Sequence, residues 1–273
     1  MPHTVRLLQE PHVHVSKLKM ISKLQLDKLY RKYNRRKYIH PDPLEFLQDY
    51  HDVRDREIAG IIASALAFGR VAQILKSVRF VLDKMGPSPR AFIESASDKT
   101  LNKVFEGFKH RFATGSDLVS LFASIKIINK KYGSLNECFT AGLKKSDHTV
   151  LEALKNFYTE LDCNQNHLLP DPSKGSACKR LNLFLRWMVR KDSVDPGGWE
   201  GVPASKLIIP LDTHMARIGK TFKLTHCESP NMTMALDITA YFSKLIPEDP
   251  VKYDFVLTRF GIRNDMDIKD ILK

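Results

Sequence analysis

The chain has 273 residues and a mass of 31.3 kDa, enough for one large domain or two small lobes with a sizeable core. Hydrophobic residues make up 43% of it and charged residues 27%, a balance that excludes general disorder. The net charge of +12 favours an anionic partner, with nucleic acid first and an acidic membrane surface second.

Hydropathy and cysteine spacing narrow the class of protein further. No apolar run approaches the roughly 18–20 residues that span a bilayer, and residues 1–9 lack the hydrophobic core of a secretory signal. The cysteines at positions 138, 163, 178 and 227 include no CxxC pair, so a zinc ribbon or a closely spaced cysteine-ligated cluster is not expected. We therefore expect a cytoplasmic protein with reduced thiols, no metal, no cofactor and no membrane partner.

In chain order, the hydrophobic pattern first predicts helices separated by short turns. A capping box at Ser22 precedes the first of them. Apolar stripes with helical spacing follow over residues 56–66 and 71–85. Two further helices are predicted over 117–132 and 149–161.

Loops and helices alternate in the second half of the chain. A polar loop over 163–173 leads into a helix over 174–190, and a second loop covers 192–204. Asp212 opens the next helix, and the last long helix is predicted to have Asp249 as its N-cap. Clear alternating strands, repeats and low-complexity tracts are absent from the sequence, so the predicted fold class is all-α.

Two segments, 174–185 and 210–219, carry the residues best suited to chemistry. The first is a turn of small residues that leads into a helix with Lys179 in its first turn. Exposed N–H groups and the helix dipole at such a place favour a phosphate. The second segment places the carboxylate of Asp212 at the start of the next helix.

Residues 210–218, Pro-Leu-Asp-Thr-His-Met-Ala-Arg-Ile, resemble the signature of the helix-hairpin-helix DNA glycosylases, which include endonuclease three, MutY and the oxoguanine glycosylases. In that family a Gly-rich hairpin ends in Lys-x-x-Asn or Lys-x-x-Asp on a helix, and the catalytic aspartate follows after a loop. Residues 179–182, Lys-Arg-Leu-Asn, are similar to the first element and Asp212 to the second. Their separation of 33 residues (212 − 179) is closer to the archaeal oxoguanine glycosylase branch than to endonuclease three.

Nearly the whole chain also resembles an uncharacterised, mostly bacterial family through residues 38–46, 174–180 and 210–214. The chain departs from the glycosylase pattern in its hairpin, where only Gly175 and small residues stand in place of Leu-Pro-Gly-Val-Gly. Leu66 or a neighbour stands where many members have a glutamine beside the base. No C-terminal cysteine cluster is present, so the resemblance implies a form without an iron–sulfur cluster.

The glycosylase resemblance implies a two-lobed fold with a cleft between the lobes. Residues 1–273 would form a single unit, with a central lobe over about 56–190 and a second lobe from about 1–55 plus 205–273. The implied activity is removal of an oxidised purine such as 8-oxoguanine from double-stranded DNA, followed by β-elimination (AP lyase). The expected enzyme is a monomer that acts at the bacterial nucleoid.

The resemblance also implies roles for particular residues. Lys179 would be the nucleophile that forms an imine with the sugar, with Lys174 as the alternative nucleophile. Asp212 would stabilise positive charge on the sugar and transfer protons. The residues expected to contact DNA are Lys174, Gly175, Ser176, Arg180, His214, Arg217, Arg111 and Trp199.

Each central residue also has a purely structural interpretation. Lys179 can be a solvated lysine at a helix start, Asp212 a helix N-cap, and His214 a packing residue. At the level of function, one alternative is a non-catalytic DNA- or RNA-binding protein of the same fold.

A second alternative is a metal phosphohydrolase of the His-Asp type. Its doublet would be His51-Asp52, with His40 or the pair His12 and His14 as the upstream ligand. This hypothesis predicts that the protein binds a metal and that a chelator abolishes its phosphohydrolase activity.

Overall fold

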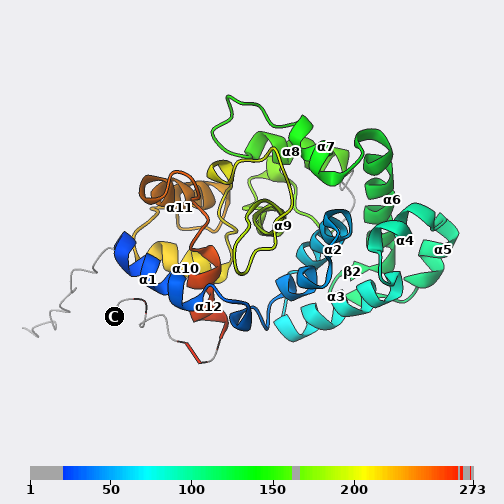
Figure 1. The fold of residues 1–273 in the computed structure, drawn as a ribbon, viewed down its shortest axis with the longest axis horizontal. Helices are drawn as coiled ribbons and strands as arrows, with labels where there is room; N and C mark the ends of the chain where they lie inside the picture. Colours follow the sequence, from blue (N-terminus) through cyan, green and yellow to red (C-terminus); the bar gives the residue numbers. More distant parts are fainter. Residues whose placement is uncertain (1–20, 162–166, 264, 267–270, 272–273) are drawn as a thin grey trace, which may run out of the picture.

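The computed structural model describes residues 21–161, 167–263, 265–266 and 271, and these form a mostly helical protein (Figure 1). The all-α fold class is thereby confirmed. The α-helices are α1 (Lys23–Tyr33), α2 (Val53–Ala65), α3 (Val71–Met85), α4 (Pro89–Ser95), α5 (Asp98–Val104), α6 (Gly115–Tyr132), α7 (Leu135–Ala141), α8 (Leu151–Glu160), α9 (Lys179–Val189), α10 (Thr213–Thr221), α11 (Met232–Leu245) and α12 (Asp254–Ile262).

Short elements connect these helices. The described residues contain one antiparallel hairpin, β1 (Lys109–His110) paired with β2 (Ala113–Thr114). Its two-residue strands do not change the fold class. The 3-10 turns are η1 (Arg36–Tyr38), η2 (Pro43–Asp49), η4 (Pro172–Lys174) and η5 (Ala204–Lys206).

Helix positions follow the local sequence signals closely in the first half of the chain. The Ser22 hydroxyl accepts a hydrogen bond from the Gln25 N–H, and the Gln25 side chain accepts one from the Ser22 N–H, as a capping box requires. Helices α2 and α3 follow the two apolar stripes, and α3 ends at Gly86, whose positive φ of 74° closes the helix.

Two helix starts were predicted too early. Asp249 does not cap the last helix, which begins at Asp254, because its carboxylate instead accepts hydrogen bonds from Arg190 Nε at 3.0 and 3.1 Å. Helix α9 begins at Lys179, five residues later than predicted. Gly175 and Cys178 adopt left-handed conformations with φ of 74° and 46°, which no helix continues through.

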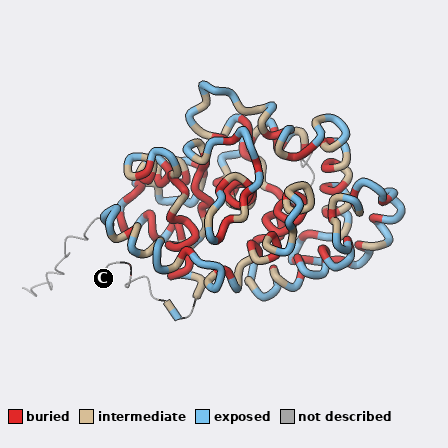
Figure 2. The backbone as a smooth tube through the Cα atoms, in the orientation of Figure 1, coloured by how far each residue is buried: buried red, intermediate tan, exposed pale blue. Residues whose placement is uncertain are grey.

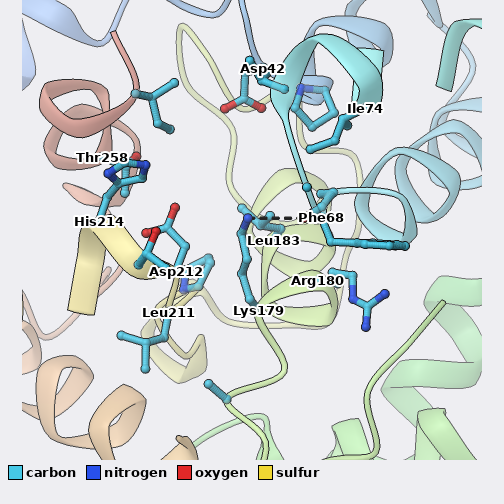
Figure 3. Close-up of a pocket in the computed structure, with 18 of the residues that line it drawn as sticks. Asp42, Phe68, Ile74, Lys179, Arg180, Leu183, Leu211, Asp212, His214 and Thr258 are labelled. Carbon is cyan, nitrogen blue, oxygen red and sulfur yellow. Dashed lines mark hydrogen bonds between the residues drawn. The ribbon is translucent and has the colours of Figure 1, made fainter. Parts of the chain in front are cut away.

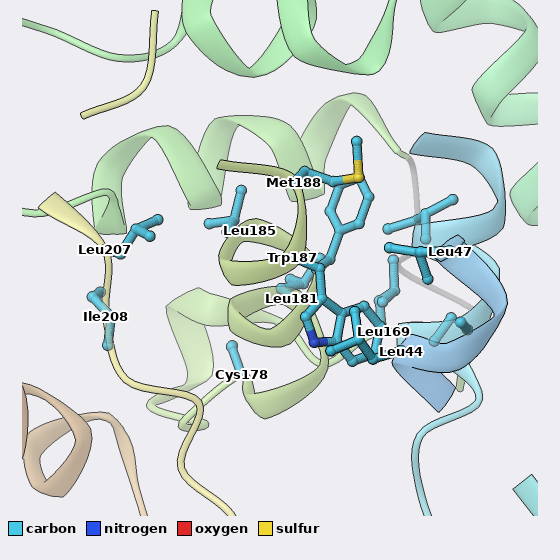
Figure 4. Packing of buried hydrophobic residues seen from close by; sticks show 14 of the residues in the cluster. Leu44, Leu47, Leu169, Cys178, Leu181, Leu185, Trp187, Met188, Leu207 and Ile208 are labelled. Atoms are coloured by element: carbon cyan, nitrogen blue, oxygen red, sulfur yellow. The ribbon is translucent and has the colours of Figure 1, made fainter. Parts of the chain in front are cut away.

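Helix α9 lies near the centre of the molecule (Figure 1). Its apolar side chains, among them Leu181, Trp187 and Met188, are buried, and Figure 4 shows them facing Leu44 and Leu47 of η2. The buried parts of the backbone concentrate on α9 and its neighbours, whereas exposed positions lie on the outer faces (Figure 2). Burial of apolar area at about 25 cal/mol per Å² makes this cluster the main stabilising element.

The helices pack in two neighbouring groups. Helix α2 packs on α9, η2 and α4, whereas α12 packs against α1 and α10 (Figure 1). The N-terminal and C-terminal parts of the described chain therefore lie side by side. Among the described residues, no helix combines the length and the apolar character that a bilayer crossing demands.

Candidate active site

A cavity of about 790 Å³ opens where α9, α10 and α12 meet the turn that follows α2. Lys179 and Asp212 both line it, and Figure 3 shows their side chains on separate elements around the same space. Its volume lies within the range of small-molecule sites, roughly 300–1,000 Å³. The structure thus brings together the two residues that the sequence singled out for chemistry.

Lys179 is the first residue of α9 and is half-buried at the cavity wall. Its Nζ donates a hydrogen bond to the Ala67 carbonyl at 3.3 Å, just beyond the end of α2 (Figure 3). Among the described residues, no carboxylate forms an ion pair with it. The amine is therefore held in place by a single neutral acceptor.

Asp212 is the N-cap of α10, as predicted. Its Oδ1 accepts a hydrogen bond from the Met215 N–H at 2.7 Å. No described residue donates to its second oxygen, Oδ2. One oxygen thus fixes the helix start, while the other has no hydrogen-bond donor among the described residues, and the side chain lines the cavity.

His214, the second residue of α10, lines the cavity. Its ring packs directly on the backbone of Gly261 in α12, so that a Cβ at position 261 would clash with the ring. This close approach accounts for the glycine and confirms a packing role for His214. The ring also borders the cavity beside Asp212 (Figure 3).

A buried carboxylate near Asp212, Asp254, was not predicted from the sequence. It lines the cavity, and its Oδ2 pairs with Arg186 Nη1. Its Oδ1 has no hydrogen-bond partner among the described residues. Burial raises the pKa of Asp254 to about 6, the Asp212 charge adds to the rise, and Arg186 opposes it. Asp254 sits in an apolar stretch of the sequence without any chemical motif, so no local signal marked it.

A second ion pair, between the buried Arg259 and the partly buried Asp42, also lines the cavity. Arg259 Nη2 donates to Asp42 Oδ2 at 2.6 Å, and Arg259 Nη1 donates to the Ile39 carbonyl at 3.3 Å. Both charged residues line the cavity. The segment 38–46, noted in the sequence without a role, thus contributes part of the wall.

The opposite wall is aromatic and cationic. The Arg180 guanidinium lies 4.8 Å from the centre of the Phe68 ring and donates to the Ala65 and His167 carbonyls at 3.4 and 3.0 Å. Burial lowers the pKa of Arg180 to about 10, so it remains charged at neutral pH. Arg111, at the tip of the β1–β2 hairpin, is exposed and also lines the cavity.

Of the other residues expected to bind DNA, some line the cavity and others lie outside its lining. Ser176 lines the cavity, whereas Lys174, Gly175 and Arg217 are exposed and lie outside its lining. Lys174 is 3.8 Å from the Asp171 carboxylate. This placement favours Lys179 over Lys174 as the candidate nucleophile.

Trp199 requires a correction, because the structure buries it to 5% exposure. Its Nε1 donates to Glu57 Oε2 at 3.0 Å, and its ring packs on Phe139, Phe157 and Phe184. The loop folds onto the core and supplies a partner for a buried carboxylate. Trp199 is therefore a core residue, and its ring is not exposed for the DNA contact expected of it.

The His-Asp doublet is used structurally. Asp52 caps α2 by accepting hydrogen bonds from the N–H groups of Arg54 and Asp55. His40 pairs with Glu45 at 2.8 Å, and positions 12 and 14 lie outside the described residues. Within the part of the chain that the structure covers, no group of three or more His, Cys, Asp or Glu side chains is arranged to hold a metal ion.

Comparison with known proteins identifies the family. A family model described as "Protein of unknown function (DUF2400)" matches residues 42–263, which is most of the chain. The chain therefore belongs to this family. No curated protein and no solved structure matches it.

Proposed function

We propose that this member of the DUF2400 family is a DNA glycosylase with an associated lyase step, acting on double-stranded DNA that carries an oxidised purine such as 8-oxoguanine. The observation that carries the proposal is that Lys179 and Asp212, on different helices, line one cavity. The proposal includes a two-lobed glycosylase-like fold, with α2–α9 in one lobe and α1 with α10–α12 in the other. It also includes a monomer that works at the nucleoid.

The chemistry assigns one role to each of the two residues. The neutral Lys179 amine attacks the anomeric carbon of the sugar, the N-glycosidic bond breaks, and the base leaves with its bonding electrons and takes up a proton. Positive charge develops on the sugar as that bond breaks, and the free oxygen of Asp212 stabilises it. The Lys179 nitrogen, now bonded to the anomeric carbon, gives up a proton to the departing base. The bond from the anomeric carbon to the ring oxygen then breaks, the ring oxygen takes up a proton, and a protonated imine forms. Loss of a proton from the neighbouring sugar carbon of this imine expels the 3′-phosphate by β-elimination.

The surroundings suit an extruded nucleotide. The target base must leave the duplex to reach such a cavity, and the flanking phosphates must be held while it does so. Arg180 and Arg111, on the wall that lacks carboxylates, are placed to hold phosphates, and the net charge of +12 favours the approach of DNA.

Borohydride trapping tests the proposal. The purified protein is incubated with duplexes that carry 8-oxoguanine, uracil or an abasic site, and covalent adducts are separated by electrophoresis. We expect an adduct that disappears in Lys179→Gln and persists in Lys174→Gln, which serves as the matched control. Loss of the adduct in Lys174→Gln alone would move the nucleophile to that residue.

A non-catalytic DNA-binding protein is the second candidate. It is favoured by the observation that Lys179 and Asp212 each already serve the fold, through the Ala67 carbonyl and the α10 N-terminus. The absence of any adduct, with duplex binding intact in Lys179→Gln, would rule out the lyase step and leave either a monofunctional glycosylase or this DNA-binding protein.

A further inference from the structure

Phe112 is an exposed aromatic side chain at the mouth of the cavity. It lies at the tip of the β1–β2 hairpin, is 54% exposed, and lines the cavity that holds Lys179. A single exposed apolar side chain is common on protein surfaces and by itself implies no partner. The position of Phe112 in the lining of the cavity that holds the candidate nucleophile is what makes its ring a candidate contact for a ligand with an apolar face.

The ring of Phe112 is part of an ordered aromatic stack. It lies 4.9 Å from the Phe68 ring with an interplanar angle of 17°, and the His167 ring lies 5.7 Å away at an interplanar angle of 81°. Phe68 directly follows Ala67, whose carbonyl accepts the hydrogen bond from Lys179. A flat ligand stacked here would consequently lie beside the candidate nucleophile.

The hairpin that carries Phe112 is fixed to the same turn. The His110 ring is fully buried between the Phe68 carbonyl, at 3.0 Å from Nε2, and the Ser77 hydroxyl, at 2.9 Å from Nδ1. The two rings of the stack are thus held by one anchored unit, so little conformational entropy is lost when a ligand binds.

Two cations flank this stack. Arg180 lies over Phe68, and Arg111 directly precedes Phe112 in the hairpin. The Arg111 side chain runs past Gly69, where an added Cβ would lie 2.9 Å from Arg111 Cδ. Aromatic faces next to arginine side chains form the usual platform for unpaired nucleic-acid bases.

We propose that Phe112 and Phe68 form a stacking platform for an unpaired nucleobase at the cavity mouth. The inference rests on the proposed function for the assignment of the cavity to nucleic acid. The base stacks on Phe112 and extends the Phe68–Phe112 pair to three rings, while Arg111 and Arg180 hold the adjoining phosphates. Any base provides the necessary flat face, so the platform selects for the unpaired state and not for one sequence.

Binding of a short single-stranded oligonucleotide, measured by fluorescence anisotropy, tests the platform. DNA and RNA of the same sequence form separate arms, and the corresponding fully paired duplex forms a third. We expect Phe112→Ala to weaken single-strand binding by about 5- to 150-fold, the range for the loss of one base–aromatic stack. The slope of log affinity against log salt stays unchanged, because no charge is removed.

Phe80 provides a matched control. It is also an exposed phenylalanine, at 40%, and it stacks on Phe108 with centroids 5.8 Å apart, but it lies outside the cavity lining. Phe80→Ala should leave single-strand affinity within about twofold of the wild type. Equal losses in Phe80→Ala and Phe112→Ala, or no single-strand binding by the wild-type protein, would overturn the proposal.

Phe112→Trp tests the stacking directly and guards against loss through misfolding. We expect it to retain affinity, since a larger aromatic face replaces the ring. The native tryptophans, Trp187 and Trp199, are buried. The fluorescence of the exposed tryptophan introduced at position 112 can therefore be followed separately, and the single strand should quench it. Emission unchanged by the saturating single strand would overturn the platform.

The two proposals fail independently. A Phe112-dependent affinity without any borohydride adduct would retain the platform and refute the lyase chemistry. The opposite result is an adduct that depends on Lys179 and forms equally well in Phe112→Ala, with no effect of Phe112 on binding. It would retain the lyase chemistry and refute the platform.

Discussion

Each end of α9 carries a pair of cationic side chains, and the two pairs have opposite surroundings. At the N-terminal end, Lys179 and Arg180 donate to backbone carbonyls and face the cavity. At the C-terminal end, Arg186 and Arg190 are buried among carboxylates. Positive charge is therefore neutralised at one end of the helix and left available at the other.

The difference separates a structural end from a ligand-binding end. Arg186 pairs with Asp195 at 3.1 Å and with Asp254, so it joins the loop after α9 to α12. Arg190 pairs with Asp192 at 2.9 Å and Asp249 at 3.0 Å. A buried cation with such partners holds the fold, whereas one that meets only carbonyls can still attract a phosphate.

The largest effect expected from this comparison is on stability, at Arg186. Arg186→Met leaves Asp254 buried without a counter-charge and leaves Asp195 with Arg190 alone, so we expect the free energy of unfolding to fall by about 3–5 kcal/mol. Urea denaturation measures the change. Arg90→Met, which removes an exposed pair with Glu94, should cost below about 1 kcal/mol. Equal costs in both variants would contradict a structural role for this end of α9.

Asp212 lets the structural and chemical roles be separated at one position. Asparagine caps helices as well as aspartate does, so Asp212→Asn should change the free energy of unfolding by below about 1 kcal/mol. It removes the negative charge, and we expect base excision to slow by about 10²- to 10³-fold. Single-turnover cleavage of the duplex measures the rate. Full activity in Asp212→Asn would leave the residue as a cap alone.

Local features of this fold could be predicted from the sequence, and distant pairings could not. The Ser22 capping box and the N-cap at Asp212 depend on residues three positions away, so both were predicted correctly. Asp249 has the same local appearance as a cap, but its carboxylate is taken by Arg190, 59 residues away. Tertiary contact overrode the local preference at that helix start.

The same distinction applies to the site. Lys179 and Asp212 could be paired from a motif and its spacing, whereas the Arg259–Asp42 pair joins positions 217 residues apart and carries no motif. Trp199 was expected to contact DNA because it lies in a Gly-rich loop that no helical periodicity assigns to the core. Its partner Glu57, 142 residues away, draws it into the core.

A smaller effect is expected on DNA affinity at the ligand-binding end. Arg180→Gln removes a cation that faces the cavity, so duplex binding should weaken several-fold and the salt slope should drop by about one. Anisotropy titrations at several salt concentrations measure both quantities. Arg217→Gln, on the exposed face of α10 outside the cavity lining, is the comparison. A larger loss there would shift the DNA path away from the cavity mouth.

The smallest effect concerns the anchor of the hairpin, His110. Burial lowers its pKa; Arg111 and Arg180 add to the decrease, while the Phe68 carbonyl opposes it. Between the lowered pKa and the unfolded value of about 6.5, the unfolded chain binds more protons at this residue than the folded chain. Its stability contribution is therefore complete above about pH 6.5 and declines as the pH falls.

His110→Gln isolates this contribution, because glutamine does not titrate. The difference in unfolding free energy between wild type and His110→Gln should shrink as the pH is lowered from about 7.5 to about 5. Urea denaturation at each pH measures it, and carboxylates elsewhere cancel in the difference. Single-strand binding should weaken over the same range in the wild type, because protonation loosens the hairpin that carries Phe112. A difference that does not change with pH would show that His110 does not titrate over this range. The stability of the hairpin would then not depend on the protonation of His110.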